Sequence, residues 1–168
     1  MRHALLALAS GVLALGGLVT PARAQFRQPP PVVRVEAAPS VSAQMPAWRE
    51  DVARHVYAAY APHIYRGQLP AWMHAVAVTE TDVDADGRVL DVRLTREPAA
   101  AKDVGPWVVG MIRQLGQLPA PRGLRGDVAQ GGAQVPQQDT VYTWVDIWLV
   151  DKSGRFQLDS LTEGQQRP

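Results

Sequence analysis

Residues 71–94 read AWMHAVAVTETDVDADGRVLDVRL, two β-like runs joined by a short acidic turn. From Ala71 to Asp82 the chain is rich in Val, Ala and Thr and contains neither glycine nor proline, and Val89 to Leu94 resumes the same pattern. Glycine adopts a positive φ at little cost, so the turn from Asp84 to Gly87 suits two antiparallel neighbours. The segment therefore predicts a β-hairpin.

One amphipathic pattern precedes this hairpin and a second one follows it. The first runs from Ala47 to about Tyr60, directly behind Pro46, with apolar residues at every fourth position. The second begins near Asp103, whose carboxylate can cap free N–H groups, and it ends at Gly116. Both patterns predict helices that bury one apolar face. The apolar positions are Trp48, Val52, Val56 and Tyr60 in the first helix, and Val104, Trp107, Val108, Met111, Ile112 and Leu115 in the second.

The strongest strand pattern spans Asp139 to Val150, where side chains alternate between two rows. Asp151 to Gly154 then predicts a turn, and Phe156 to Leu161 can add a short edge strand. The order of elements predicts an α+β fold, α-β-β-α-β, in which two helices pack on an antiparallel sheet of three strands, or of four if the edge strand forms. The two rows are Val141, Thr143, Val145, Ile147 and Leu149 on one side, and Tyr142, Trp144, Asp146, Trp148 and Val150 on the other.

The sequence divides the chain into four parts. Residues 1–24 are typical of a secretory signal peptide, with a basic start, an apolar run from Ala4 to Thr20 and a small-residue cleavage motif; a retained membrane anchor is the alternative. Residues 25–46 are rich in Pro and Ala and predict an extended tether. Residues 47–162 hold the folded domain, and residues 163–168 predict a disordered tail. We expect a periplasmic protein with no membrane span once the signal is removed.

Composition excludes several classes of function. The chain has 168 residues and no cysteine, which rules out disulfides, thiolate metal sites and a cysteine nucleophile. Removal of the predicted signal leaves 15 basic and 16 acidic residues, because two of the 17 basic residues and none of the acids lie within it. A near-neutral chain with mixed signs argues against a nucleic-acid partner. No cofactor is indicated.

The acidic turn matches the first half of a calcium-binding loop. Asp82, Asp84 and Asp86 are spaced two residues apart and Gly87 follows, as at the start of an EF-hand loop. The last position of such a loop should be a bidentate glutamate, and here it is Arg93. A solvated hairpin turn is the favoured interpretation. A small calcium-binding periplasmic protein that uses these three aspartates is the alternative function.

No catalytic constellation is visible in the sequence. His55 and Asp51 are four residues apart and could share a metal, but no third ligand follows at a recognisable spacing. The G-x-S-x-G and H-E-x-x-H motifs are absent, and Ser153 lies in a predicted turn. We expect a non-enzymatic protein; an envelope hydrolase would need Ser153 or a carboxylate pair buried in a cleft.

An aromatic row supplies the candidate binding residues. Both sides of the last strong strand are apolar or aromatic, which is more than a half-buried sheet requires. We expect one side to pack on the helices and the aromatic side to be covered by the long loop, by a second copy in a homodimer, or by a partner. The candidate partner-binding residues are Tyr142, Trp144 and Trp148.

The order of elements and three short motifs resemble the C-terminal domain shared by TonB and TolA. The motifs are the turn from Val83 to Val92, the second helix with Leu118 to Pro121 behind it, and Val141 to Val150 in the place of the family's last strand. The resemblance implies a three-stranded antiparallel sheet backed by two helices, in the periplasm. It also implies an activity of binding, in which partners pair with an open sheet edge or pack on an exposed face. Trp144 and Trp148 would then be the anchors.

Three departures separate the chain from that family. The N-terminal apolar segment is expected to be lost, residues 122–138 are an insertion, and the segment after Gly154 can occupy the edge that family members leave open. Energy transduction needs a membrane anchor. We therefore expect a soluble periplasmic relative that contacts an envelope protein of unknown identity.

Overall fold

The computed structural model describes residues 26–70, 73–124 and 140–162. The predicted signal peptide, most of the predicted insertion and the predicted tail lie outside the described residues. As the sequence predicts, the described chain is an α+β fold in which two helices pack on an antiparallel sheet, here of four strands. None of the described helices is long and apolar enough to cross a membrane.

The sheet has the strand order β2-β1-β3-β4. The predicted hairpin forms from β1 (Ala75–Val83) and β2 (Val89–Arg96), and β3 (Tyr142–Val150) pairs with β1 over its whole length. β4 (Phe156–Leu158) is the first half of the predicted edge strand, Phe156–Leu161. It pairs with the last three residues of β3, and Phe156 also forms a parallel bridge with Ile64. Short 3-10 turns occupy Ala61–His63 and Asp159–Leu161.

Local chemistry explains the hairpin turn. A side-chain oxygen of Asp84 accepts hydrogen bonds from the main-chain N–H groups of Asp86 and Arg88, both at 2.9 Å. Gly87 has a φ of 82°, and a Cβ on it would lie 2.1 Å from the main-chain oxygen of Leu118. Only glycine fits this position, because the turn packs directly on the segment that follows the second helix.

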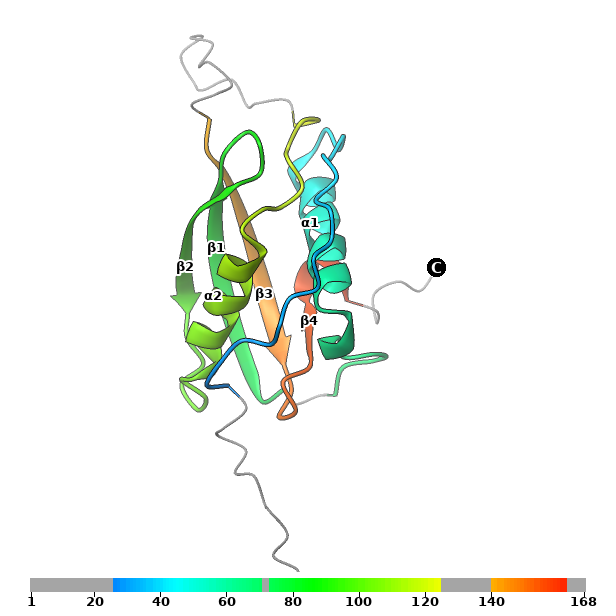
Figure 1. Cartoon of the computed structure of the whole chain (residues 1–168). Helices are drawn as coiled ribbons and strands as arrows, with labels where there is room; N and C mark the ends of the chain where they lie inside the picture. The colour runs from blue at the N-terminus through cyan, green and yellow to red at the C-terminus, as the bar shows by residue number, and fades with distance from the viewer. Residues whose placement is uncertain (1–25, 71–72, 125–139, 163–168) are drawn as a thin grey trace, which may run out of the picture.

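The two helices, α1 (Met45–Ala59) and α2 (Val104–Leu115), lie on the same side of the sheet (Figure 1). Their apolar faces are largely buried, and Gly116 ends α2 with a φ of 68°, both as predicted. The side chain of Asp103 makes no capping hydrogen bond, so that prediction is wrong. Asp103 has helical backbone angles, whereas a capping residue needs an extended backbone to bring its carboxylate over the first turn.

The residues expected to form a tether instead pack on the domain. Residues 26–42, called the strap from here on, run as an irregular segment that crosses from α2 to α1 (drawn in blue in Figure 1). Phe26 and Ser40 are buried near its two ends. The last two residues of the predicted tether, Met45 and Pro46, already belong to α1. The strap thus completes the helical layer.

Candidate interaction surface

The aromatic row of β3 lies in the core, which corrects the expectation that it faces a partner. Trp144 and Trp148 are fully buried, and Tyr142 is nearly so. The indole N–H of Trp148 donates to the hydroxyl of Thr79 at 3.0 Å, and its ring centroid lies 4.9 Å from that of Phe156. Both rows of β3 are largely apolar, and the two helices pack on the aromatic row.

The opposite row of β3 belongs to the sheet face that the described helices leave uncovered. This face is apolar along β3 and charged along β2. On β2, Arg93 contacts Asp82 at 2.6 Å and Asp91 at 3.0 Å. The open face is therefore only partly apolar. Its β3 residues are Thr143, Val145, Ile147 and Leu149, all partly exposed.

The three aspartates of the candidate calcium loop do not converge. Asp82 is paired with Arg93, and the hydrogen bond from that guanidinium lowers the pKa of Asp82. Asp84 caps its own turn, and Asp86 is paired with Arg122. Across residues 26–70, 73–124 and 140–162, no group of three acidic or imidazole side chains could hold a metal ion. The calcium alternative therefore has no site among these residues, because each carboxylate already has its own donor.

His55 and Asp51, the possible metal pair, also face different partners. Asp51 accepts hydrogen bonds from the hydroxyls of Ser40 and Ser42 at 2.6 and 2.7 Å. Burial lowers the pKa of His55, although a hydrogen bond to the main chain of Gln117 acts in the opposite direction. At neutral pH we expect an uncharged imidazole that is hydrogen-bonded to the main chain of Gln117, just after α2.

Ser153 lies exposed in the turn between β3 and β4, where its hydroxyl donates to the carboxylate of Asp151 at 2.8 Å. A hydroxyl in this position stabilises the turn. The serine version of the hydrolase hypothesis is therefore excluded, because that version required Ser153 to be buried in a cleft.

Aromatic packing holds the first end of the strap. Phe26 is 5% exposed, and its ring packs edge-on against Trp107 at 5.3 Å between centroids and stacks on His74 at 5.9 Å. Pro29 lies against Gly110 of α2, where an added Cβ would come within 3.1 Å of the proline ring. α2 thus carries its smallest residue where the strap crosses it.

Main-chain hydrogen bonds hold the rest of the strap. The N–H of Val33 donates to the carbonyl of Ala59 at 3.0 Å, which satisfies a carbonyl at the end of α1. Ser40 donates its N–H to the carbonyl of Ala120 at 2.9 Å, and its own carbonyl accepts from the N–H of Gly123 at 3.0 Å. The strap is therefore fixed at its start, its middle and its end.

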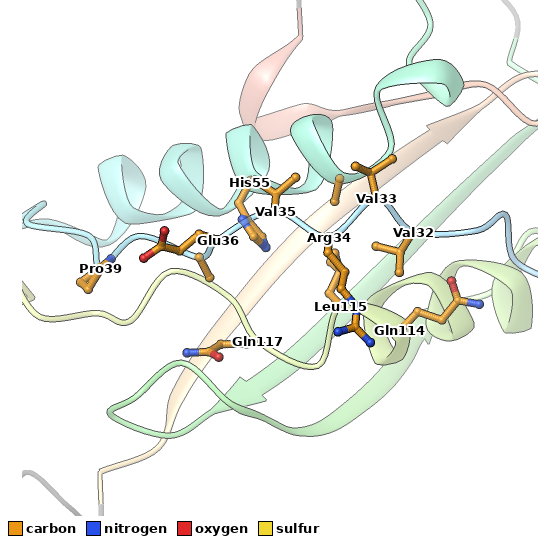
Figure 2. A pocket seen from close by; sticks show the side chains of 12 residues that line it. Val32, Val33, Arg34, Val35, Glu36, Pro39, His55, Gln114, Leu115 and Gln117 are labelled. Carbon is orange, nitrogen blue, oxygen red and sulfur yellow. The ribbon is translucent and has the colours of Figure 1, made fainter.

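Beside the middle of the strap lies a hollow of about 700 Å³ (Figure 2). One wall is the strap itself from Val32 to Ala37. His55 of α1 points toward it, and Gln114, Leu115 and Gln117 form the wall at the end of α2. A second hollow of about 400 Å³ adjoins the first, between the strap and the middle of α1. The strap is consequently accessible along much of its length.

Exposed apolar side chains gather on and next to the strap. Six large apolar residues are exposed among those that the structure describes, and four of them lie between positions 33 and 45. Val33 is 53% exposed, Val35 39% and Val41 87%, and Met45 follows at the start of α1. The remaining two are Leu90 and Val141. Most of the large apolar side chains that are exposed in the described part of the chain therefore lie on the strap or next to it.

Sequence reasoning missed the strap because it has no periodic pattern. Its prolines and alanines are typical of a spacer. Main-chain hydrogen bonds can form with any residue type, so they produce no recognisable pattern in the sequence. One signal was available: Phe26 and the run Val32-Val33 bring an aromatic and β-branched residues into an otherwise spacer-like composition. An aromatic residue beside a proline run is more typical of a docked segment than of a free one.

No significant match for this chain is found among protein-family models, curated proteins or solved structures. The geometry and chemistry of its own side chains are therefore the basis for assigning a function.

Proposed function

We propose that the exported chain is a non-enzymatic protein–protein interaction module of the bacterial cell envelope, and that the strap and the hollow beside it form its contact surface. The observation that carries this proposal is the concentration of exposed valines on a segment anchored at both ends. Contiguous apolar surface on a soluble domain marks a binding site, whereas scattered apolar residues need no explanation.

The anchoring of the strap favours binding. A segment that is already ordered loses little conformational entropy when a partner docks on it. Phe26 and Ser40 fix its ends, and Val33 fixes its middle through Ala59. A partner would meet a preformed surface, so less of the contact energy would be offset by ordering the strap.

The envelope location rests on the sequence. The signal-peptide pattern in residues 1–24 directs export, and the resemblance to the TonB and TolA C-terminal domains suggests a periplasmic binding role. The observed order of helices and strands is compatible with that resemblance. The surface proposed here is the strap and not the family's sheet edge, which β4 occupies along the last three residues of β3.

Site-specific photo-crosslinking in intact cells tests the proposal. A photoreactive amino acid is placed at Val35 or Val41 on the strap, and at Leu90 on β2 as a control whose exposure lies between theirs. We expect adducts with an envelope protein from both strap positions and none from Leu90, and we expect Val33→Asp with Val35→Asp to abolish the adduct from position 41. Equal adducts from Leu90, or none from the strap, would contradict the proposal.

A further inference from the structure

We infer that the partner of the strap is a second copy of this chain, and that the two straps pair as antiparallel strands centred on Val35. This inference rests on the proposed function, since it names the partner of the same surface. It follows from the main-chain groups that the strap leaves unpaired and from the order of its charged residues.

The direction of the main-chain groups is set by one hydrogen bond. The N–H of Val33 points toward α1, where it donates to Ala59 at 3.0 Å. In an extended chain successive main-chain groups point to opposite sides, so those of Arg34 and Glu36 point away from α1. No described residue pairs with the N–H of Arg34 or Glu36. The carbonyl of Glu36 accepts from the N–H of Ala38 at 3.1 Å, which makes a γ-turn at Ala37, so the extended part of this segment ends at Glu36. The carbonyl keeps a second lone pair for another donor.

These free groups form a template for an added strand. Unpaired N–H and C=O groups on an exposed extended segment attract another chain in the same geometry as a sheet edge. Val32, Val33 and Val35 have high β-propensity. The segment is bounded by Pro31, which has no N–H, and by the γ-turn at Ala37, and these would end the pairing on the two sides.

The sequence of the template is self-complementary. In an antiparallel pair centred on Val35, Arg34 lies opposite Glu36 of the second copy, and Glu36 lies opposite its Arg34. The γ-turn at Ala37 limits the pairing to Arg34, Val35 and Glu36. Opposite charges on facing strand positions stabilise a pair, and like charges oppose it. A two-fold axis through Val35 therefore gives two ion pairs and one valine contact.

The hydrogen-bonding pattern agrees with this register. Arg34 and Glu36 carry the outward main-chain groups, so they occupy the hydrogen-bonded positions of the antiparallel pair. Val35 then occupies a non-hydrogen-bonded position, where facing side chains are closest. Its side chain, 39% exposed in the single chain, would be covered by Val35 of the second copy.

The β2 edge of the sheet is a poorer template. β2 is the outer strand on the hairpin side, and its pairing with β1 is broken by register shifts at Val78/Thr79 and at Asp82/Val83. Such bulges twist an edge, and charged side chains such as Arg93 discourage pairing further. The strap also carries two charged side chains, Arg34 and Glu36, but in the proposed pair each faces the opposite charge.

Disulfide trapping of the purified mature chain tests the inference, because the native chain has no cysteine. In the proposed dimer the two Val35 Cα atoms are about 4.5 Å apart, within the range that a disulfide spans. Val35→Cys should give a disulfide-linked dimer under mild oxidation. Val33→Cys is the matched control, since Val33 is more exposed but lies away from the two-fold axis, so the two Val33 residues do not face each other. Equal crosslinking of both variants, or of neither, would overturn the inference.

A charge exchange provides a second test that does not depend on cysteine. Glu36→Arg places two arginines opposite each other at both ends of the pair, and we expect dimerisation to weaken about tenfold in sedimentation equilibrium. The double variant Arg34→Glu with Glu36→Arg restores the opposite charges and should restore the dimer. A double variant as weak as the single one would overturn the inference.

The two proposals can fail separately. If the strap crosslinks in cells to a different envelope protein while Val35→Cys stays monomeric, the second copy is not the partner, and the proposed function stands. If the strap forms adducts with nothing and the chain is monomeric, both proposals are wrong. Adducts of the chain with itself from positions 35 and 41, together with the Val35→Cys dimer, would support both.

Discussion

The ring of Phe26 packs edge-on against the ring of Trp107 with 5.3 Å between their centroids, and this contact ties the strap to α2. The two residues are far apart in the sequence, and only Trp107 lies in a predicted element. Their contact makes the N-terminal segment part of the folded domain. Its contribution to stability can be measured.

Phe26→Ala should destabilise the domain. The ring is almost completely buried, and removing a buried phenylalanine costs about 3 kcal/mol or more through lost burial and the cavity left behind. Urea unfolding of the mature chain measures this loss. Val41→Ala is the control on the same segment, because Val41 is exposed and should change the free energy of unfolding little. Equal effects of the two substitutions would show that the strap unfolds independently of the domain.

Trp148→Ala should abolish stable folding or lower the free energy of unfolding by about 4 kcal/mol, because the indole is buried and hydrogen-bonded to Thr79. Val145→Ala is the matched control, since it lies on the same strand but on the uncovered face. We expect it to cost much less. Thermal unfolding of both variants compares the two faces of β3, and a tolerated Trp148→Ala would contradict the assignment of the core face.

Gly87→Ala should be far more damaging than Gly67→Ala. Both glycines have a positive φ, 82° and 88°, so both substitutions introduce backbone strain. Only at Gly87 would the new Cβ collide with the main chain of Leu118, whereas nothing lies within 4 Å of the position at Gly67. The difference in melting temperature between the two variants isolates the clash. Similar melting temperatures would show that the hairpin turn does not pack on the segment behind α2.

Asp146 should make stability fall as pH rises. Burial raises its pKa, and this outweighs the hydrogen bonds from Ser160 and Ile147 and the charge of Arg49. A raised pKa means that the folded state binds the proton more tightly than the unfolded state does. Its contribution to stability is therefore present below the ordinary aspartate pKa and is lost as pH rises through the raised value.

The substitution Asp146→Asn isolates this effect, because Asp51 and Asp82 have lowered pKa values and act in the opposite direction. Urea unfolding of both proteins from about pH 4 to about pH 7 is the measurement. The native protein should lose stability relative to the variant as pH rises. A difference that stays constant with pH would mean that Asp146 ionises as easily in the folded state as in the unfolded state.

Calcium should not stabilise the protein. A ligand that binds only the folded state raises the melting temperature. Asp82 and Asp86 are engaged by Arg93 and Arg122, so the ion would have to displace two guanidinium groups. The check is the melting temperature in millimolar calcium, compared with the melting temperature in the presence of a chelator. A clear rise with calcium alone would revive the metal hypothesis.

The elements of the fold were predictable because each depends on neighbours in the sequence. Gly87 specifies a tight turn by its own backbone freedom, and the four-residue spacing of Trp48, Val52 and Val56 specifies a helical face. Gly116 ends α2 for the same local reason. Such signals need no knowledge of the rest of the chain, and the predicted hairpin and helices were confirmed.

The surface could not be predicted in this way, because burial depends on contacts between distant segments. Alternation along β3 separates two rows, but both are apolar, and only the packing of α1 and α2 makes Trp148 a core residue and leaves Val145 on the uncovered face. The strap is bound by one aromatic contact at Phe26 and by main-chain hydrogen bonds, which every residue type can form. Sequence periodicity therefore specified the helices and strands, whereas the exposed valines became a candidate interaction surface only through the folded arrangement.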